Sequence, residues 1–103
     1  MAWAWQRLRG THGRVAIGEL AAALGWSRKR IVARFRDEIG LPPKAVARLL
    51  RFEHARALAG TMPWGELAFE CGFSDQSRLI AEFRLITDRT PETFLQDTVA
   101  QTA

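Results

Sequence analysis

The chain has 103 residues, 48% of them hydrophobic and 25% charged, which is typical of one folded domain and excludes a large multidomain enzyme. Its 15 Lys and Arg residues against 11 Asp and Glu residues give a net charge of +4, which favours acidic partners. The charge is unevenly placed, because residues 1–51 have a net charge of +8 and residues 52–103 a net charge of −4.

Apolar residues recur three and four positions apart along almost the whole chain, and this spacing predicts an all-α fold of about seven helices. Glycines, prolines and small polar residues mark where the helices begin and end, and Ser27, Ser74 and Thr90 are the predicted N-caps. The helices are predicted over residues 2–9, 17–24, 28–39, 42–58, 64–71, 75–86 and, as a short last one, from residue 91.

The apolar positions on these helices also predict the core. Ile31, Phe35 and Ile39 lie four residues apart on the third helix, and Leu79 and Phe83 form the inward edge of the sixth. Cys71 follows an apolar stripe and is predicted to be a small buried thiol. The other predicted packing residues are Trp3, Trp5, Val46, Leu49, Leu50, Phe52, Leu58 and Trp64. For Trp3 and Trp5 the alternative is a surface that once met another domain.

The chain contains the same unit twice. Residues 18–21 (Gly-Glu-Leu-Ala) recur identically 47 positions later, and the Gly-Trp-Ser of residues 25–27 matches a later Gly-Phe-Ser at the same offset. One extra residue follows that turn, after which an offset of 48 aligns Phe35 with Phe83. A short helix, a glycine turn, a capping serine and a longer helix make up each copy, which is the layout of a helix-turn-helix.

Together the two copies resemble the DNA-binding domain of the AraC family of bacterial transcription regulators. One departure is Asp88, which stands where the family pattern has glycine. The resemblance covers nearly the whole chain, and the segments that carry it are residues 25–36, 40–43, 68–77, 83–84 and 90–91.

This organisation predicts two helix-turn-helix subdomains, about residues 1–41 and 61–98, joined by a long linker helix of about residues 42–59. A linker helix of roughly 16 to 17 residues is about 25 Å long. Together with the subdomains at its ends, this helix would hold the second helices of the two helix-turn-helix units about one DNA turn apart, near 34 Å. We therefore expect both to enter successive major grooves. We therefore expect sequence-specific binding of double-stranded DNA by a transcription regulator.

In the first copy, the second helix has a basic face opposite Ile31 and Phe35. Lys and Arg side chains bind the phosphate backbone and also read guanine. An isolated basic run is more simply a solvated surface, but its place in a helix-turn-helix favours DNA. The predicted DNA-binding residues of this copy are Ser27, Arg28, Lys29, Arg30, Val32, Ala33 and Arg36.

In the second copy, the corresponding helix carries fewer positive charges, so its DNA contacts depend more on polar side chains. Gln76 is suited to hydrogen bonding with adenine. Two roles are equally consistent with Asp75: a contact with cytosine, or a first-turn charge that complements the helix dipole. The predicted DNA-binding residues here are Ser74, Asp75, Gln76, Ser77, Arg78 and Ala81. Further candidates for phosphate contacts, in both copies and the linker helix, are Arg34, Lys44, Arg48, Arg51 and Arg84.

The sequence offers little for catalysis. His12 and His54 lie far in the sequence from any convincing acid–base partner and do not form a metal-ligand pair, a single cysteine excludes a multi-cysteine zinc site, and no glycine-rich phosphate loop occurs. We therefore predict no enzymatic activity, no cofactor and no metal. No window approaches the roughly 20 apolar residues that cross a membrane, so no membrane contact is predicted either.

One alternative function belongs to another class: a helical protein-interaction module that meets a basic partner through the net −4 of residues 52–103. Steep weakening by salt would distinguish DNA binding from it. The family resemblance implies a bacterial cytoplasmic protein that meets RNA polymerase. It also implies a sensing or dimerisation domain, usually N-terminal to this unit, although some members consist of the unit alone.

Overall fold

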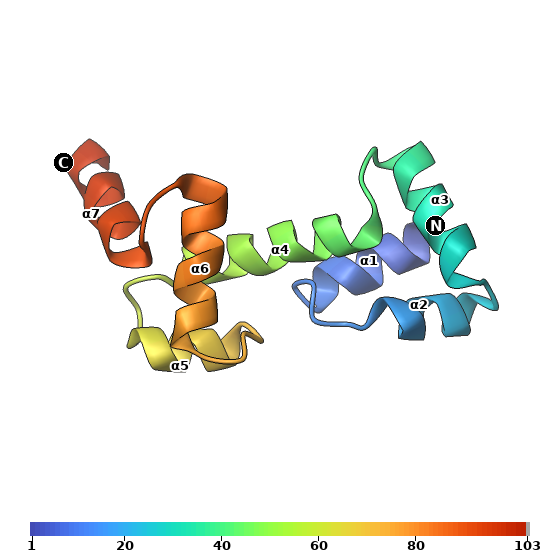
Figure 1. Cartoon of the computed structure of the whole chain (residues 1–103), viewed down its shortest axis with the longest axis horizontal. Helices are drawn as coiled ribbons and strands as arrows, with labels where there is room; N and C mark the ends of the chain where they lie inside the picture. The colour runs from blue at the N-terminus through green and yellow to red at the C-terminus, as the bar shows by residue number, and fades with distance from the viewer. Residues whose placement is uncertain (103) are drawn as a thin grey trace. The chain divides into compact units, whose positions relative to one another are not determined.

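Helices make up the computed structural model, which describes the backbone of residues 1–102 and the side chains of residues 1–96 (Figure 1). No strand occurs in the part of the chain that it describes, so the predicted all-α fold is confirmed. The helices are α1 (Ala2–Gly10), α2 (Ile17–Leu24), α3 (Arg28–Glu38), α4 (Pro43–Leu58), α5 (Trp64–Glu70), α6 (Gln76–Thr87) and α7 (Pro91–Thr102). The last has 12 residues and is longer than predicted, since no Gly or Pro interrupts residues 92–102.

Side-chain caps begin the two helices that follow the glycine turns. Ser27 accepts a hydrogen bond from the backbone N–H of Arg30 at 3.1 Å, which confirms the predicted cap of α3. The prediction of Ser74 as the cap of α6 is wrong, because Asp75 accepts from the backbone N–H of Arg78 at 2.9 Å instead. The extra residue of the second copy moves the capping position by one, and a carboxylate there complements the positive end of the helix dipole.

The C-terminal end of α6 shows how the chain accommodates Asp88, the departure from the family pattern. Asp88 follows the helix with a φ of 61°, in the left-handed region that glycine adopts most easily. Asp is one of the few other residues that enter this region at modest cost. Thr90 then caps α7 as predicted, accepting a hydrogen bond from the backbone N–H of Thr93 at 3.2 Å.

Two compact units divide the chain, and each is described by itself: unit 1 is Met1–Arg51 and unit 2 is Phe52–Ala103. The residues of α4 are shared between them. In unit 1, Leu8 of α1, Leu20 of α2 and the predicted pair Ile31 and Phe35 of α3 are at most 1% exposed. Burial of these side chains from three helices stabilises the unit by removing apolar surface from water.

Unit 2 is built around an aromatic cluster. The Phe52 and Phe83 rings meet edge to face with centroids 5.0 Å apart, and Phe94 of α7 lies 5.6 Å from Phe83. Leu79 is fully buried beside them, as predicted. Cys71 is also buried, which confirms the predicted buried thiol.

Three predicted packing residues are instead exposed: Ile39 by 37%, Leu49 by 44% and Trp3 by 47%. Ile39 is the C-cap residue of α3, beyond the last turn that packs. On α4 the buried stripe passes through Val46 and Ala47, to one side of Leu49, and Trp3 lies away from the buried residues of α1. The remaining predictions of packing residues are confirmed by partial or full burial: Trp5, Val46, Leu50, Phe52, Leu58 and Trp64.

Candidate nucleic-acid interface

Each unit joins two helices through a turn of the same construction. In unit 1 the backbone N–H of Trp26 donates to the carbonyl of Ala21 at 2.8 Å, and in unit 2 that of Phe73 donates to Ala68 at 2.9 Å. The glycine before each aromatic residue has a φ of 70° and 83°, respectively, a conformation that other residues avoid. The pairs α2–α3 and α5–α6 are therefore two helix-turn-helix units whose turns are closed by the same backbone hydrogen bond.

The second helix of each pair presents four positions, related by an offset of 48 residues, on the side opposite its buried residues. We call each set a recognition face. In both sets the second side chain is half-buried and the other three are exposed. The recognition faces are Lys29, Val32, Ala33 and Arg36 of α3, and Ser77, Ile80, Ala81 and Arg84 of α6.

Beside the recognition face of α3, two predicted contact residues pack on the turn. The guanidinium groups of Arg30 and Arg34 lie 4.6 and 5.4 Å from the centre of the Trp26 ring. Arg34 also pairs with Glu38 at 2.8 Å. Such cation–π contacts contribute about 0.5–1 kcal/mol at exposed sites and fix the side chains. Arg30 and Arg34 therefore form a cluster of their own at the edge of the face.

The predicted DNA-binding residues are exposed, with the exception of the half-buried Val32. Sequence reasoning alone missed Ile80, which the offset of 48 from Val32 would have found. The same offset makes Arg78 the counterpart of Arg30, at the edge of the recognition face of α6. The exposed residues are Ser27, Arg28, Lys29, Arg30, Ala33 and Arg36 in unit 1, and Ser74, Asp75, Gln76, Ser77, Arg78 and Ala81 in unit 2.

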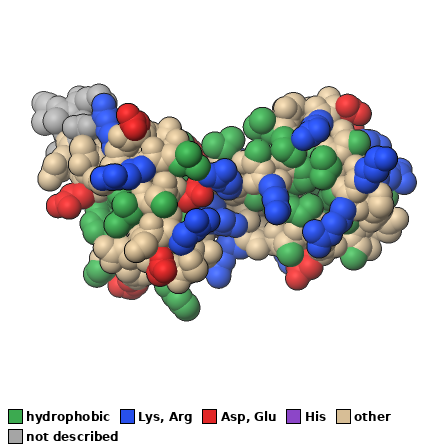
Figure 2. Space-filling view, in the orientation of Figure 1, with side chains coloured by type: hydrophobic (Ala, Val, Ile, Leu, Met, Phe, Trp, Pro, Cys, Tyr) green, Lys and Arg blue, Asp and Glu red, His purple; other side chains and the backbone are tan. Residues whose placement is uncertain are grey.

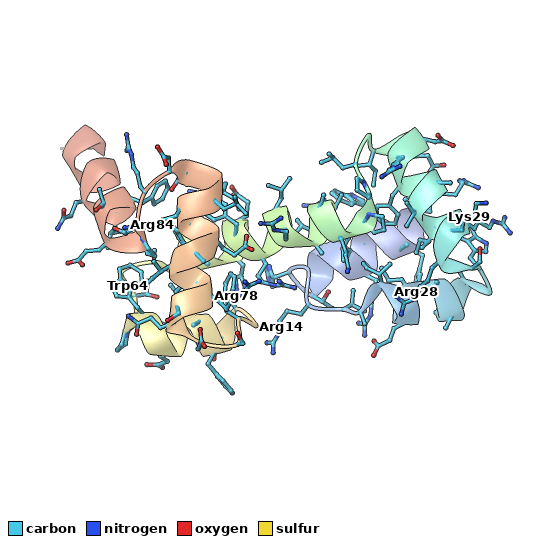
Figure 3. The ribbon with its side chains drawn as sticks, viewed as in Figure 1. Arg14, Arg28, Lys29, Trp64, Arg78 and Arg84 are labelled. Carbon is cyan, nitrogen blue, oxygen red and sulfur yellow. The ribbon has the colours of Figure 1, made fainter. Side chains whose placement is uncertain are left out.

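A surface hollow of about 410 Å³ in unit 1 brings together most of the remaining basic candidates. Residues 13–18 form one wall, where Arg51 Nη2 donates a hydrogen bond to the Gly13 carbonyl at 3.2 Å. The guanidinium of Arg28 lies over Gly18, since a Cβ at that glycine would be 2.9 Å from Arg28 Nη2. We call this site the basic hollow; its charged lining residues are Arg14, Arg28, Lys44, Arg48 and Arg51, of which Figure 3 labels Arg14 and Arg28.

Of the predicted phosphate contacts, Lys44, Arg48 and Arg51 line the basic hollow, whereas Arg34 and Arg84 lie on α3 and α6 outside it. Arg14 was missed by sequence reasoning, because it lies in an irregular segment where helix periodicity gives no direction for a side chain. On the face drawn in Figure 2, basic side chains outnumber acidic ones over unit 1. The site is thus a strongly positive surface on a helix-turn-helix.

Neither metal binding nor membrane insertion is indicated by the described part of the chain. Among the side chains of residues 1–96, no three His, Cys, Asp or Glu residues lie close enough to hold a metal ion. None of the described helices has the length and apolar character needed to cross a membrane.

Comparison with protein families matches residues 20–97 to a helix-turn-helix domain of the AraC type. Two curated relatives come from strains of Mycobacterium tuberculosis, and each is named a probable bifunctional transcriptional activator/DNA repair enzyme AlkA. Each is 36% identical to this chain over 84 residues, which is 80% of this chain. The chain spans only 17% of the length of these relatives.

Solved structures give the same result. The DNA-binding domain of AdpA, a global transcriptional factor crystallised in complex with a target DNA, matches with a TM-score of 0.80 and 28% identity. That match covers 97% of this chain and 89% of the other. The xylose-binding transcription activator XylR matches with a TM-score of 0.75 and 24% identity over 88% of this chain and 25% of its own, which shows the shared fold.

Proposed function

The chain belongs to the family of AraC-type helix-turn-helix domains, and we propose that it is the DNA-binding domain of a transcription regulator. Its target is double-stranded DNA, which it recognises in a sequence-specific manner through the recognition faces of α3 and α6. The likeness to the AdpA domain, which was solved with its target DNA, supports this proposal.

The recognition face of α3 is the observation that carries the proposal. Lys29 and Arg36 are exposed on it, on either side of the small apolar residues Val32 and Ala33. Lys and Arg reach guanine O6 and N7 or a phosphate, and small apolar side chains meet the thymine methyl group. Around the N-terminus of α3, further contacts are proposed for Ser27, Arg28 and Arg30.

The recognition face of α6 has one positive charge, Arg84, where that of α3 has two. Base contacts in unit 2 therefore depend on Ser77, Ala81 and Ile80, with Arg84 on a base or a phosphate. The flanking contacts that we propose at the N-terminus of α6 are those of Ser74, Asp75, Gln76 and Arg78.

Both recognition faces bind one DNA site in this proposal, with subdomains of about residues 1–41 and 61–98. The linker helix α4 has 16 residues and is about 24 Å long at 1.5 Å per residue. Successive major grooves lie about 34 Å apart. Bending of the DNA, at a cost of a few kcal/mol, would let both recognition faces enter successive grooves. A gel shift with a site cut to one half should show much weaker binding, and unchanged affinity would contradict two-groove binding.

Selection of bound duplexes from a random pool is the experiment that tests DNA recognition most directly. A selected consensus of two half-sites is expected. With about five to eight phosphate contacts, the logarithm of the binding constant should fall with the logarithm of salt concentration with a slope of about −5 to −7. Enrichment of no sequence, with no affinity for any duplex at low salt, would contradict the proposal.

A matched pair of variants makes the selection specific to the recognition face. Lys29→Ala with Arg36→Ala should weaken binding to the selected duplex, whereas Arg7→Ala with Arg9→Ala removes the same charge from the exposed side of α1. The second pair should bind nearly as the wild type does. Equal losses in both would show that net charge alone, rather than the recognition face, determines the affinity.

The alternative function is a helical protein-interaction module. Two exposed apolar side chains in unit 2 favour it: Phe69 on α5 is 79% exposed and Leu85 on α6 is 67% exposed. Aromatic side chains such as Phe are enriched in protein–protein interfaces. If Phe69 contacts a protein partner, the Phe69→Ala variant should lose binding of that partner and retain duplex binding. The two functions can therefore be tested separately.

The setting of the domain is also proposed. RNA polymerase is a proposed partner, and the bacterial cytoplasm is the proposed location. Two arrangements fit the family: a sensing or dimerisation domain on the N-terminal side of this unit, or the unit alone. We assign no enzymatic activity to these residues, since the match to the bifunctional AlkA relatives is limited to 17% of their length.

A further inference from the structure

The basic hollow of unit 1 has a structural counterpart in unit 2. A smaller hollow of about 170 Å³ is lined there by Trp64, Gln76, Ile80, Thr90, Pro91 and Glu92. Offsets of 47 and 48 residues relate these positions to unit 1: Ile17 corresponds to Trp64, Arg28 to Gln76 and Lys44 to Glu92. Three lining positions of the two hollows therefore correspond, one from each of three helices in each unit.

A glycine lies under the equivalent side chain in both hollows. In unit 1 the guanidinium of Arg28 lies over Gly18, and a Cβ there would be 2.9 Å from Arg28 Nη2. In unit 2 the amide of Gln76 lies over Gly65, and a Cβ there would be 3.6 Å from Gln76 Oε1. The first residue of each second helix thus folds back over the first turn of the helix before it.

Each hollow is lined by residues from the first turns of three helices. In unit 1 the lining residues from these turns are Ile17 and Gly18 of α2, Arg28 of α3 and Lys44 of α4. No side chain caps α2, whose N-cap is Ala16. The first backbone N–H groups of a helix and the positive end of its dipole favour an anion, and phosphate is the common one.

Charge distinguishes the two hollows. Five basic and no acidic side chains line the hollow of unit 1, all within the described residues. In unit 2 the lining contains Glu92 and no basic side chain, again among described residues. Glu92 places a carboxylate in the first turn of α7, where unit 1 has the ammonium group of Lys44 in the first turn of α4.

We propose that the basic hollow is a site for one phosphate of the DNA backbone, and that its counterpart with Gln76 and Glu92 does not hold phosphate. Arg28 and Lys44 bind the phosphate directly, and Arg14, Arg48 and Arg51 add to the positive field. Charge-assisted hydrogen bonds from guanidinium and ammonium groups are the strongest that such a site can offer. The inference rests on the proposed DNA binding, and it assigns to Arg28 the positioning of the backbone rather than the reading of a base.

A scan of neutral backbone substitutions tests this on the duplex selected from the random pool. Each phosphate near the site is replaced in turn by a methylphosphonate, which removes one charge. For the wild-type chain, one position should weaken binding about tenfold. For Arg28→Gln with Lys44→Glu, which introduces the residues of unit 2, the same position should make no difference.

Two further variants serve as controls. Arg9→Gln with Arg7→Glu changes the net charge by the same amount on α1, and it should retain the sensitive phosphate. Gln76→Arg with Glu92→Lys introduces the residues of unit 1 into unit 2, and it should create a second sensitive phosphate. Thermal melting of each variant checks that these exposed substitutions leave the fold intact.

Each outcome decides between the hypotheses. Wild-type binding with no phosphate that depends on Arg28 and Lys44 would overturn the inference and leave the proposed function standing. Absence of duplex binding by the wild-type chain would overturn both. An NMR titration with inorganic phosphate identifies the source: saturable shifts at Gly18 and Arg28 without a sensitive DNA phosphate would assign the hollow to a free anion and overturn the backbone contact.

Discussion

The two helix-turn-helix units have the same backbone plan but opposite charge. Both turns are closed by the same backbone hydrogen bond, and both recognition faces have the same order of exposed and half-buried positions. Residues 1–51 nevertheless have a net charge of +8 and residues 52–103 one of −4. The glycine, apolar and capping positions therefore determine this fold, whereas the exposed positions determine the charge that each unit presents to DNA.

Their cores reach equal burial by different means. Within residues 1–51, all of which are described, Phe35 is the one aromatic side chain among the fully buried residues, and the half-buried Trp5 and Trp26 pack against this core. In unit 2, Phe52, Phe83 and Phe94 form a cluster of edge-to-face rings. Ring–ring contacts require defined angles, so a cluster of three rings tolerates smaller shifts than a core whose buried residues are mostly aliphatic. We therefore expect the aromatic core to be the more sensitive of the two to truncation.

Truncation of the two equivalent core phenylalanines should have the largest effect. Phe35→Ala and Phe83→Ala each create a cavity and should lower the free energy of unfolding by about 3–5 kcal/mol. Phe83→Ala should lie at the upper end, because each lost ring contact is worth about 0.5–1.5 kcal/mol in addition. Denaturant unfolding measures both. Phe69→Ala on the 79% exposed side chain is the control, and a loss as large as that of Phe83→Ala would contradict this assignment of the core.

Matched substitutions on the recognition faces should sharpen the difference in charge. Lys29→Ala should weaken DNA binding by about 1–3 kcal/mol and reduce the magnitude of the salt slope by about one. Ser77→Ala at the equivalent position should leave the slope unchanged, whereas Ser77→Lys should increase it by about one. Binding isotherms at several salt concentrations measure both quantities. If Lys29→Ala lowers the free energy of unfolding by as much as it weakens the free energy of DNA binding, its side chain is not part of an exposed face.

Much of this comparison could be predicted from the sequence, because local rules determine it. The spacing of Ile31 and Phe35 gives the buried side of α3 and, by opposition, its recognition face. Ser27 is placed by the common preference for a hydroxyl at an N-cap. The internal repeat then transfers the buried positions to unit 2, where the prediction of Leu79 and Phe83 as buried residues is confirmed.

Features that depend on competition or on distant segments could not be predicted. Ser74 and Asp75 both suit an N-cap, and only the backbone register decides in favour of the carboxylate. The partners of long cationic side chains, such as Arg34 on Trp26, depend on rotamers that sequence spacing does not fix. The basic hollow joins residues 13–18 to Lys44, far apart in the sequence, so periodicity could not reveal it.

Removal of the two caps should have a moderate effect on stability. Ser27→Ala and Asp75→Ala should each lower the free energy of unfolding by about 1 kcal/mol, because each leaves a first-turn N–H group without its acceptor. Ser74→Ala is the control and should change it by less than about 0.5 kcal/mol. Thermal melting distinguishes the three. A larger effect for Ser74→Ala than for Asp75→Ala would restore the serine as the cap.

The smallest expected effect comes from the two glycines under the first residues of α3 and α6. Gly65→Ala should stabilise the fold by about 0.5–1 kcal/mol, since its Cβ would meet Gln76 Oε1 at an ordinary 3.6 Å. Gly18→Ala should give a similar gain at the cost of displacing the flexible end of Arg28, which would be 2.9 Å from the new Cβ. Melting temperatures should therefore rise in both variants, but DNA affinity should fall a few-fold only in Gly18→Ala. Equal DNA affinities in the two variants would show that the position of Arg28 over α2 does not matter for binding.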